Sequence, residues 1–571
     1  MRREAPKQSS GQEELAGAAL ALAAVLFVLG SFGALMAAHW LDTGHWPTVT
    51  DTLVSLFKGD VGWSWWHTVM GLMWVGAIIG ALIPVLRWNG RRVAGQEDMD
   101  RKADHMGETD GLTREAAQAK SDKAHLTNFD IPPGIQYGTA VRDNVDLWTG
   151  WRDATLVIAG PGWGKSTGLV IPIILDAPGV VLATTIRRDV PDAVRLACET
   201  RGTFYCFDPM GIADYQEGGT PLWWWNPLRQ IKGPVEARAL GTIFAEAVMP
   251  EGAQKHPYFD TKGPALLGSL LFAAAVGGFQ LPKVYEWLAD PDDREPIEIL
   301  RLAGHRLSSM SLAGAYKTDA GEKSGLFGTA GNAVEWMNDP KILEWITDDG
   351  TRPEFDPDSF VRSGRDTLIA LSKEDDGSAA ALTTALTVTV TKAAERYAMR
   401  LRGGRMDPPM VAALDEIVNV APWQRLPKLF SHYGGTGISL FAFTQNWSQG
   451  VTAWKHPGMQ ALWDAATVRI VGGGLADESF LGRISKLTGQ RWIRKTSSQD
   501  GQGRGSTTVG PDREFILDID ELGALDPGKF VVFASGEYAV LGETRPWWKR
   551  PEMVADVEAS KARYEPVGVN P

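Results

Sequence analysis

The stretch from Thr155 to Leu175, TLVIAGPGWGKSTGLVIPIIL, constrains the fold of this chain more than any other. A short β-rich run, Leu156 to Ala159, is followed by a glycine-rich loop and then by a second apolar run. Glycines let backbone N–H groups converge on an anion, and a helix that starts directly after the loop favours phosphate through its dipole. The segment therefore predicts a strand, a phosphate-binding loop and a helix, which together begin an α/β nucleotide-binding domain.

The loop holds the residue types that ATP and Mg²⁺ require. Lys165 is the cation expected to reach the β- and γ-phosphates, and the hydroxyl of Ser166 is the expected Mg²⁺ ligand. The match to G-x-x-x-x-G-K-[ST] is imperfect, because the small residue Ala159 stands at the first position. Glycine-rich turns followed by Lys also arise by chance, but the strand before and the helix after favour a functional loop. The predicted nucleotide-binding residues are Gly160, Pro161, Gly162, Trp163, Gly164, Lys165, Ser166 and Thr167.

An acid pair that follows a later apolar strand predicts the second half of the same site. The strand Met410 to Leu414 ends in Asp415 and Glu416. An acid at the tip of a buried strand can hold Mg²⁺, and its neighbour can orient and polarise the attacking water. Asp415 is thus a predicted metal ligand beside Ser166. Gln445, after the strand that begins at Ile438, either senses the γ-phosphate or is an ordinary strand-end glutamine; the predicted catalytic set is Lys165, Asp415, Glu416 and Gln445.

The order of predicted elements indicates an α/β fold with a parallel sheet. Strands are predicted in GVVLATT and TFYCFDP, with a helix between them, and the sheet resumes at DTLIALS. Ala- and Leu-rich runs with helical period separate these two parts. A polar run at 497–510 is predicted as a mobile loop. The predicted domains are a membrane anchor (1–94), a linker (95–150), the first part of a RecA-like P-loop ATPase domain (151–229), an all-α insertion (230–350) and the second part of the ATPase domain (351–571).

Two runs near the N-terminus predict transmembrane helices. Leu15 to Ala38 and Trp63 to Leu86 contain no Asp, Glu, Lys or Arg, and each exceeds the roughly 20 residues that a helix needs to cross a bilayer. Basic residues precede the first run and follow the second, which by the positive-inside rule predicts that both termini are cytoplasmic. Two buried core helices are the alternative. The predicted location is the cell membrane, with a cytosolic body from about residue 95.

Net charge and cysteine usage argue against a basic DNA-binding module and against a metal site built from cysteines. The net charge is -12 and the isoelectric point about 5.4, which argues against a basic DNA-binding module but leaves room for a local basic channel. The two cysteines, Cys198 and Cys206, form no metal-binding pattern, so buried free thiols are expected.

Several motifs in order resemble the type IV secretion coupling proteins, the TraG-like conjugation ATPases. The resemblance extends from about residue 15 to 550 and rests on AGPGWGKSTGLVIPIIL, CFDP, WNPL, FDPDSFVRSGRDTLIAL, AALDEIVNVAPWQRLPKLFSHYGGTGISLFAFTQNWSQ, IVGGGLADESFLGRISKLTG and ETRPWW. It implies a homo-hexameric ATPase at the membrane that recruits a relaxase bound to single-stranded DNA and feeds it to a secretion channel. It also implies that Lys165 and Ser166 bind nucleotide and Mg²⁺, and that Asp415 and Glu416 form the hydrolytic pair.

The chain departs from the family pattern in the segment SHYGGTGI, Ser431 to Ile438. Many relatives carry an arginine there that reaches into the neighbouring subunit, whereas this chain has Gly434 and Gly435. Arg425 and Arg469 are the candidates to replace it. Arg187 and Arg188 stand where relatives often have a lysine, and their role stays open.

Two other functions fit parts of the sequence. An FtsK-like translocase of double-stranded DNA would share the motor, but the helical insertion and the lack of a C-terminal winged-helix pattern favour the coupling ATPase. A substrate-docking receptor would also have the phosphate-binding loop, but its nucleotide would be structural and would not be hydrolysed.

Overall fold

The computed structural model describes residues 99–123, 131–215, 220–248, 257–373, 377–499 and 506–566, together with short runs among the first hundred residues. The chain divides into two compact units, residues 1–100 and 101–571. In the first unit, the rings of Trp40 and Trp46 stack with their centroids 5.7 Å apart. The second unit carries the fold described below.

The predicted membrane location is contradicted by the structure. In the part of the chain that is described, no helix is both long enough and apolar enough to cross a bilayer. The 22-residue helix α15 (Gly377–Ala398) has the length but carries Lys392 and Glu395, and it packs against the sheet. The two runs predicted as spans, Leu15 to Ala38 and Trp63 to Leu86, lie almost wholly outside the described residues. An uncharged run of sufficient length meets one requirement of a span but does not establish one.

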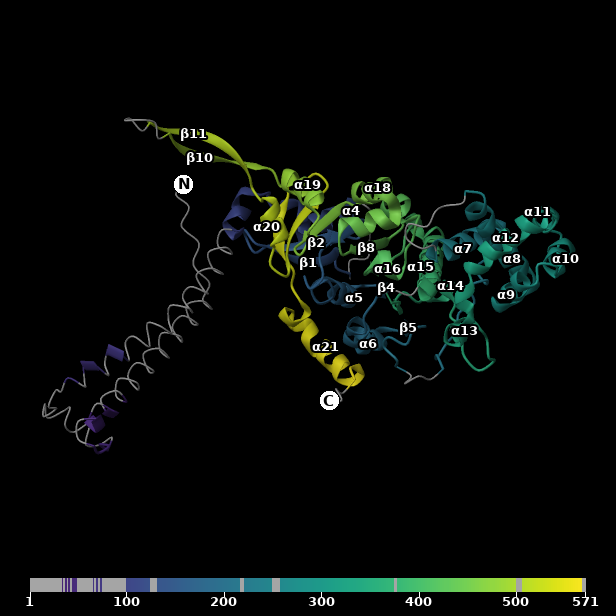
Figure 1. The fold of residues 1–571 in the computed structure, drawn as a ribbon, viewed down its shortest axis with the longest axis horizontal. Helices are drawn as coiled ribbons and strands as arrows, with labels where there is room; N and C mark the ends of the chain where they lie inside the picture. The colour runs from purple at the N-terminus through teal and green to yellow at the C-terminus, as the bar shows by residue number, and fades with distance from the viewer. Residues whose placement is uncertain are drawn as a thin grey trace. The chain divides into compact units, whose positions relative to one another are not determined.

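Eleven of the thirteen described strands of the second unit form one sheet, in the order β2-β1-β13-β12-β9-β3-β8-β7-β4-β6-β5. Figure 1 shows the arrangement of these elements. From β9 to β5 neighbouring strands are parallel, and β12, β13, β1 and β2 extend the sheet in antiparallel pairs. This mixed sheet confirms the predicted α/β class. The strands are β1 (Gly134–Ala140), β2 (Asp146–Gly150), β3 (Thr155–Ile158), β4 (Val181–Thr185), β5 (Phe204–Phe207), β6 (Thr367–Leu371), β7 (Met410–Leu414), β8 (Ile438–Thr444), β9 (Val468–Gly472), β12 (Lys529–Ala534) and β13 (Val540–Glu543).

Helices cover both faces of the parallel strands, which explains their continuous apolar sequences. Every residue of β3, β4, β6, β7 and β8 is buried. On one face, side chains such as Val157, Val181 and Val411 share a core with α5 and α6, against which α21 packs. On the other face, α15, α17 and α18 contact the strands. These helices are α5 (Ile171–Asp176), α6 (Asp189–Arg201), α17 (Leu426–Gly435), α18 (Trp447–Ala465) and α21 (Pro551–Tyr564).

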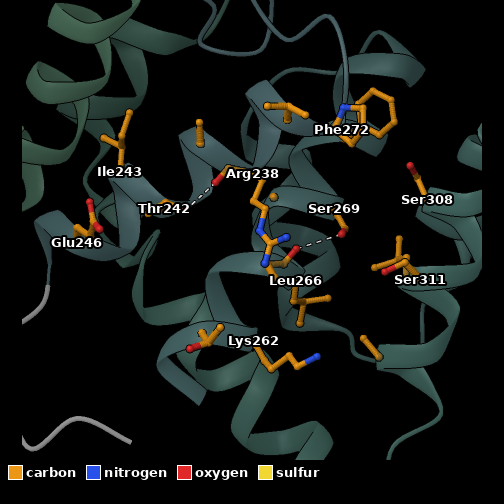
Figure 2. A pocket seen from close by; sticks show the side chains of 18 of the residues that line it. Arg238, Thr242, Ile243, Glu246, Lys262, Leu266, Ser269, Phe272, Ser308 and Ser311 are labelled. Carbon is orange, nitrogen blue, oxygen red and sulfur yellow. Dashed lines mark hydrogen bonds between the residues drawn. The ribbon is translucent and has the colours of Figure 1, made fainter. Parts of the chain in front are cut away.

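Between β5 and β6 the described chain folds into a run of helices. The first two, α7 and α8, approach so closely that a Cβ added to Gly268 would lie 2.7 Å from the Cα of Arg238. A pocket opens beside them (Figure 2). The helices are α7 (Pro234–Ala247), α8 (Phe259–Gly277), α9 (Pro282–Ala289), α10 (Glu295–Leu302), α11 (Arg306–Tyr316), α12 (Ala320–Asn332), α13 (Pro340–Ile346) and α14 (Pro357–Ser363).

Two segments differ from their sequence-based predictions. Residues 134–150, predicted as part of a linker, form β1 and β2, and β1 pairs with β13 from the far end of the chain. The predicted polar loop at 497–510 falls largely within a hairpin of β10 (Gln490–Gln499) and β11 (Ser506–Phe515). In both segments, hydrogen bonds between paired backbones stabilise the strands. Such pairing does not require a periodic pattern of apolar residues, so the sequence gives little sign of it.

The end of α17 packs against the short connection between β2 and β3, and Gly434 and Gly435 allow this contact to be tested. A Cβ at Gly434 would lie 2.1 Å from the carbonyl oxygen of Arg152, whereas a Cβ at Gly435 would meet nothing within 4 Å. We therefore expect Gly434→Ala to lower the free energy of unfolding by about 1–3 kcal/mol, because the backbone must shift. Gly435→Ala is the matched control and should be neutral or slightly stabilising. Denaturant titration of both variants measures the difference, and equal stabilities would contradict the packing at Gly434.

Candidate nucleotide-binding site

The predicted phosphate loop joins β3 to a helical turn at the carboxyl edge of the sheet. β3 lies between β8 and β9, both parallel to it. Gly162 and Gly164 adopt left-handed conformations, with φ of 75° and 103°, that side chains rarely allow. The turn η3 (Ser166–Val170) begins directly after Lys165 and continues into α5. The loop therefore leads into the N-terminal end of a helix, the arrangement that favours bound phosphate.

The end of β9 and the start of β12 fix the shape of the loop. The Gly160 N–H donates to the Gly473 carbonyl at 2.9 Å, and the indole N–H of Trp163 donates to the Lys529 carbonyl at 2.7 Å. A Cβ on Gly160 would lie 2.2 Å from the carbonyl oxygen of Gly474. The backbone at Gly474 thus leaves no room for a side chain at position 160. Ala159, the residue at the imperfect first position of the motif, is fully buried.

Lys165 links the loop to the acid pair. Its side chain is buried, and its Nζ donates to the Ala159 carbonyl at 2.8 Å. The same Nζ lies 3.4 Å from Oε1 of Glu416, whose side chain is also buried. The fold thus brings together two residues that lie far apart in sequence and that the sequence assigns to one site.

The acid pair occupies the end of β7. Oδ1 of Asp415 is buried and has no hydrogen-bond partner among the described residues, while its backbone carbonyl accepts from the Thr184 hydroxyl at 2.8 Å. Burial raises the pKa of Asp415 to about 7, and the Glu416 charge adds to the rise while Lys165 opposes it. Glu416 has a φ of 48°, which is uncommon for a residue with a side chain and marks local strain at the site.

Asp189 is a third carboxylate at this edge, and sequence reasoning missed it. It begins α6, just after β4, and β4 is the direct neighbour of β7. Its Oδ1 is buried without a partner in the described part of the chain, and its charge contributes to the raised pKa of Asp415. The signal was an acid shortly after a buried apolar strand, the same pattern that identified Asp415, but two arginines between strand and acid drew attention instead.

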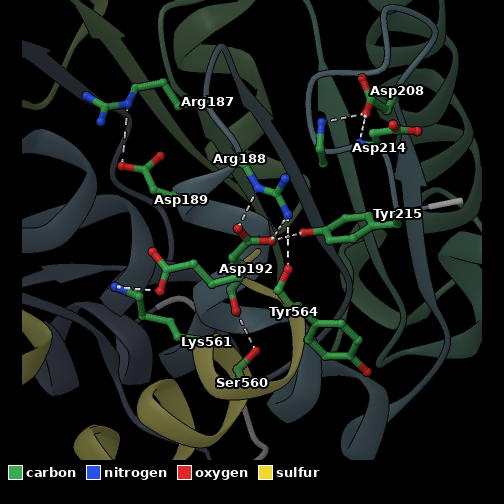
Figure 3. A network of polar contacts seen from close by, with 12 residues as sticks. Arg187, Arg188, Asp189, Asp192, Asp208, Asp214, Tyr215, Ser560, Lys561 and Tyr564 are labelled. Atoms are coloured by element: carbon green, nitrogen blue, oxygen red, sulfur yellow. Dashed lines mark hydrogen bonds and ion pairs between the residues drawn. The ribbon is translucent and has the colours of Figure 1, made fainter. Parts of the chain in front are cut away.

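Those two arginines differ in their surroundings (Figure 3). Arg187 is exposed and lies 3.6 Å from Asp189. Arg188 donates to Asp192 at 2.8 Å and to the Tyr564 carbonyl at 3.0 Å, and the Tyr215 hydroxyl also bonds Asp192 at 2.7 Å. These bonds tie α21 to the start of α6. Arg188 therefore holds the helix that presents Asp189.

The remaining predicted residues lie at the same edge. Ser166 begins η3 and is half-buried, and the Thr167 hydroxyl lies 3.4 Å from the Gly164 carbonyl. Gln445 directly follows β8, where Thr444 pairs with Ile158, so it lies beside the start of the loop.

Neither candidate arginine contacts Lys165 or the acid pair through an interaction in the described residues. Arg469 on β9 donates to the Trp463 carbonyl at 2.8 Å and stacks over the Trp463 ring. Arg425, at the start of α17, is exposed.

The residues at this edge fit a Mg²⁺ ion that arrives with a nucleotide. Within the described residues, no cluster of three or more His, Cys, Asp or Glu could hold a metal alone, and both cysteines are free. Mg²⁺ usually takes one or two carboxylates and completes its shell with phosphates and water. The unpartnered buried oxygens of Asp415 and Asp189 and the Ser166 hydroxyl have the donor chemistry for that role.

Comparisons with known proteins agree with this geometry. The α/β sheet carries a strand, a glycine loop and a helical turn in the order that a phosphate-binding loop requires. Residues 409–527 match the family described as the TraM recognition site of TraD and TraG. The comparison with curated proteins gave no match.

Solved structures of the coupling protein TrwB share the fold. An unbound form of the bacterial conjugative coupling protein TrwBΔN70 has a TM-score of 0.53 and 16% identity, covering 72% of this chain and 88% of TrwBΔN70. TrwB with the GTP analogue GDPNP has a TM-score of 0.51 and 15% identity, covering 69% and 85%. TrwB with ADP and Mg²⁺ has a TM-score of 0.50 and the same identity and coverage. The matches confirm the predicted resemblance to TraG-like conjugation coupling proteins.

The raised pKa of Asp415 predicts a pH-dependent cost of burying its charge. Its folded-state pKa of about 7 exceeds the unfolded value of about 3.9, so stability is lost as pH rises through this window. Asp415→Asn removes the charge. Without nucleotide, its stability relative to wild type should therefore increase by about 1 kcal/mol between pH 6 and pH 8. Urea denaturation at both pH values measures this change.

The control for this prediction is Glu344→Gln, which removes an exposed acid on α13. Its stability relative to wild type should hardly change over the same pH range. An Asp415→Asn variant that behaves like this control would contradict a buried charge at position 415.

Proposed function

We propose that this chain is an ATPase that couples a DNA or relaxase–DNA substrate to a type IV secretion channel and drives conjugative transfer. The observation that carries the proposal is the 3.4 Å contact between Lys165 of the phosphate loop and Glu416 after β7. It joins a phosphate-binding lysine to a carboxylate suited to act on water. The confirmed resemblance to TraG-like coupling proteins supports the choice of reaction and substrate.

Each residue then has a role that its chemistry supports. The loop N–H groups from Gly160 to Gly164 and the ammonium of Lys165 bind the phosphates, with Ser166 and Thr167 following at the helix start. Ser166 and Asp415 would hold Mg²⁺, which would supply positive charge to the phosphate oxygens. Glu416 orients the attacking water and accepts its proton, and Gln445 senses the γ-phosphate from β8.

The contacts of Lys165 suggest how binding prepares hydrolysis. Its ammonium donates to the Ala159 carbonyl and lies next to Glu416. Phosphates compete for this ammonium because a charged oxygen is a stronger acceptor than a neutral carbonyl. Once Lys165 turns towards them, Glu416 loses its nearest cation and becomes a better base. Nucleotide binding thereby activates the group that polarises the water.

The partners follow from the resemblance and from the comparisons. TrwB is described as a bacterial conjugative and plasmid coupling protein, and the matched family as a TraM recognition site. We infer single-stranded DNA with its relaxase, components of the secretion channel and assembly into a homo-hexamer. Because net charge is -12, DNA contacts would be local clusters of basic residues rather than a property of the whole surface.

Two substitutions separate a motor from a docking receptor. Lys165→Ala removes the phosphate-binding cation and should weaken ATP binding by about tenfold or more. Glu416→Gln keeps size and hydrogen bonding but removes the proton acceptor, so it should preserve ATP binding and lower turnover by about 100-fold or more. Isothermal titration with ATP and a phosphate-release assay measure both effects. Lys428→Gln, an exposed change on α17, should leave both unchanged.

Transfer of DNA between cells completes this test. The motor predicts that Glu416→Gln abolishes transfer although it binds ATP. Normal transfer by that variant would refute the proposed motor and favour a receptor in which nucleotide is structural.

If the subunits assemble into a hexamer, the rate of ATP hydrolysis per mole of protein should depend on protein concentration. If an arginine from a neighbouring subunit completes each site, the isolated chain hydrolyses ATP slowly. We expect activity per mole of protein to rise by about tenfold or more as the protein assembles. Phosphate release measured beside light scattering over a dilution series gives both quantities. Activity strictly proportional to concentration, with assembly visible, would show that each chain holds a complete site.

A further inference from the structure

A second site lies away from the phosphate loop, in a cavity of about 1060 Å³. Its walls come from α7, α8, α11 and α12 of the helical segment and from α15 and the start of α17 beside the sheet. Its volume is at the upper end of the range for pockets that enclose small ligands, so it can hold several side chains of a larger molecule. The phosphate loop and the acid pair do not line this cavity, although Arg425, a candidate for the arginine that reaches a neighbouring subunit, does.

Four basic side chains line the cavity, against one acid, Glu246. Arg238, Lys262 and Arg425 are exposed and Lys392 is partly buried, and among the described residues none of the four side chains takes part in an ion pair or hydrogen bond. Figure 2 shows Arg238 and Lys262 with Ser269 and Ser311 among the lining side chains. Like charges that outnumber the nearby acid repel one another, and a bound anion relieves that repulsion.

Lys392 is the most buried of the four cations. Burial lowers the pKa of its ammonium, and the charge of Arg425 lowers it further, although Glu236 and Glu395 act in the opposite direction. The carboxylates near Lys392 therefore do not cancel its burial. An anion brought into the cavity would face a cation that has lost part of its hydration and has gained no ion pair in return.

The helices around the cavity add to its positive potential. Pro234 and Val235 of α7, Leu307 and Ser308 of α11, and Arg425 at the start of α17 all line it. In the described part of the chain, none of these three helices has an N-cap side chain that hydrogen-bonds to its first turn. Their partly positive N-terminal ends thus border the same space as the four basic side chains.

The apolar part of the lining favours a peptide over a nucleic acid. Leu266, Phe272 and Leu312 are buried at the wall, together with Trp423. Single-stranded nucleic acids bind through exposed aromatic faces on which bases stack. Phe272 and Trp423 are only 2% and 3% exposed, and Phe272 packs against His305, so neither offers such a face. Tyr258 also lines the cavity and is 42% exposed, but one ring does not give the series of faces on which successive bases stack. Aliphatic side chains and carboxylates match this lining better.

We propose that this cavity docks an acidic, partly apolar peptide segment of a partner protein. Carboxylates of the segment contact Arg238, Lys262, Lys392 and Arg425, while its apolar side chains pack against the wall formed by α8 and α11. The site is separate from the nucleotide site but connected to it through the chain, because Arg425 follows the acid pair by a single short helix, α16 (Ile417–Val420). A peptide bound at Arg425 can therefore affect the acid pair at the end of β7 through α16.

The test measures binding of a fluorescein-labelled peptide of alternating Glu and Leu to the full chain by fluorescence anisotropy. We expect saturable binding, and about tenfold weaker binding for the same peptide with Gln in place of Glu. The variant Arg238→Gln/Lys262→Gln should weaken binding of the Glu peptide by about tenfold, because both cations are removed. Lys392→Met, tested separately, should weaken it as well.

Two controls make the outcome specific. Lys428→Gln removes an exposed cation on α17 that does not line the cavity, and it should bind the peptide as wild type does. The Arg238→Gln/Lys262→Gln variant should hydrolyse ATP at the wild-type rate without peptide, which separates this site from the motor. If hydrolysis fails in the wild type but the peptide still binds as expected, the motor is refuted and the docking site stands.

Three results would overturn the proposal. The wild type fails to bind the peptide while it hydrolyses ATP, the Gln peptide binds as well as the Glu peptide, or the double variant binds as wild type does. A single-stranded oligonucleotide serves as competitor. If it binds more tightly than the peptide and depends on the same cations, the cavity is a nucleic-acid site and the peptide proposal is wrong.

Discussion

The balance of buried charge at the carboxyl edge of the sheet is the constraint on which this site depends. One cation, Lys165, lies within 3.4 Å of Glu416, and Asp415 and Asp189 add two further carboxylates nearby. One ammonium cannot compensate the two buried acids Asp415 and Glu416, and burial raises the pKa of Asp415 to about 7. A divalent cation would correct this imbalance, and a triphosphate would bring that cation with it. The electrostatics of the protein alone therefore favour the complex of Mg²⁺ with nucleotide.

The sheet topology makes this concentration of charge possible. Parallel order from β9 to β5 turns the ends of β3, β4, β7 and β8 towards one edge, where the loop, Asp189, the acid pair and Gln445 follow. Packing behind that edge keeps these groups in place. Trp163 is bonded to the start of β12, and α21 is tied to α6 through Arg188 and Asp192. Elements far apart in sequence thus support a single site.

Much of the site could be predicted because its signals are local. A strand, a glycine loop and Lys165 are adjacent in sequence, and the acid pair follows an unbroken apolar strand. Features that depend on distant partners could not be predicted: β1 pairs with β13, and β10 pairs with β11 through largely polar residues. Asp189 follows a buried apolar strand, but only the pairing of β4 with β7 brings it to the same edge as the acid pair. The membrane prediction failed because an uncharged run reports composition, whereas a span requires a helix that the described residues do not contain.

The central claim is that Lys165 and Glu416 serve one nucleotide, and that Lys165 turns from Glu416 to the phosphates when it binds. An experimental structure with a non-hydrolysable ATP analogue and Mg²⁺ tests this most directly. The account predicts the analogue on the loop, Lys165 Nζ at the β- and γ-phosphates and no longer bonded to Ala159, and Glu416 facing the γ-phosphate. An analogue bound elsewhere, or Lys165 still bonded to Ala159 beside a bound analogue, would contradict it.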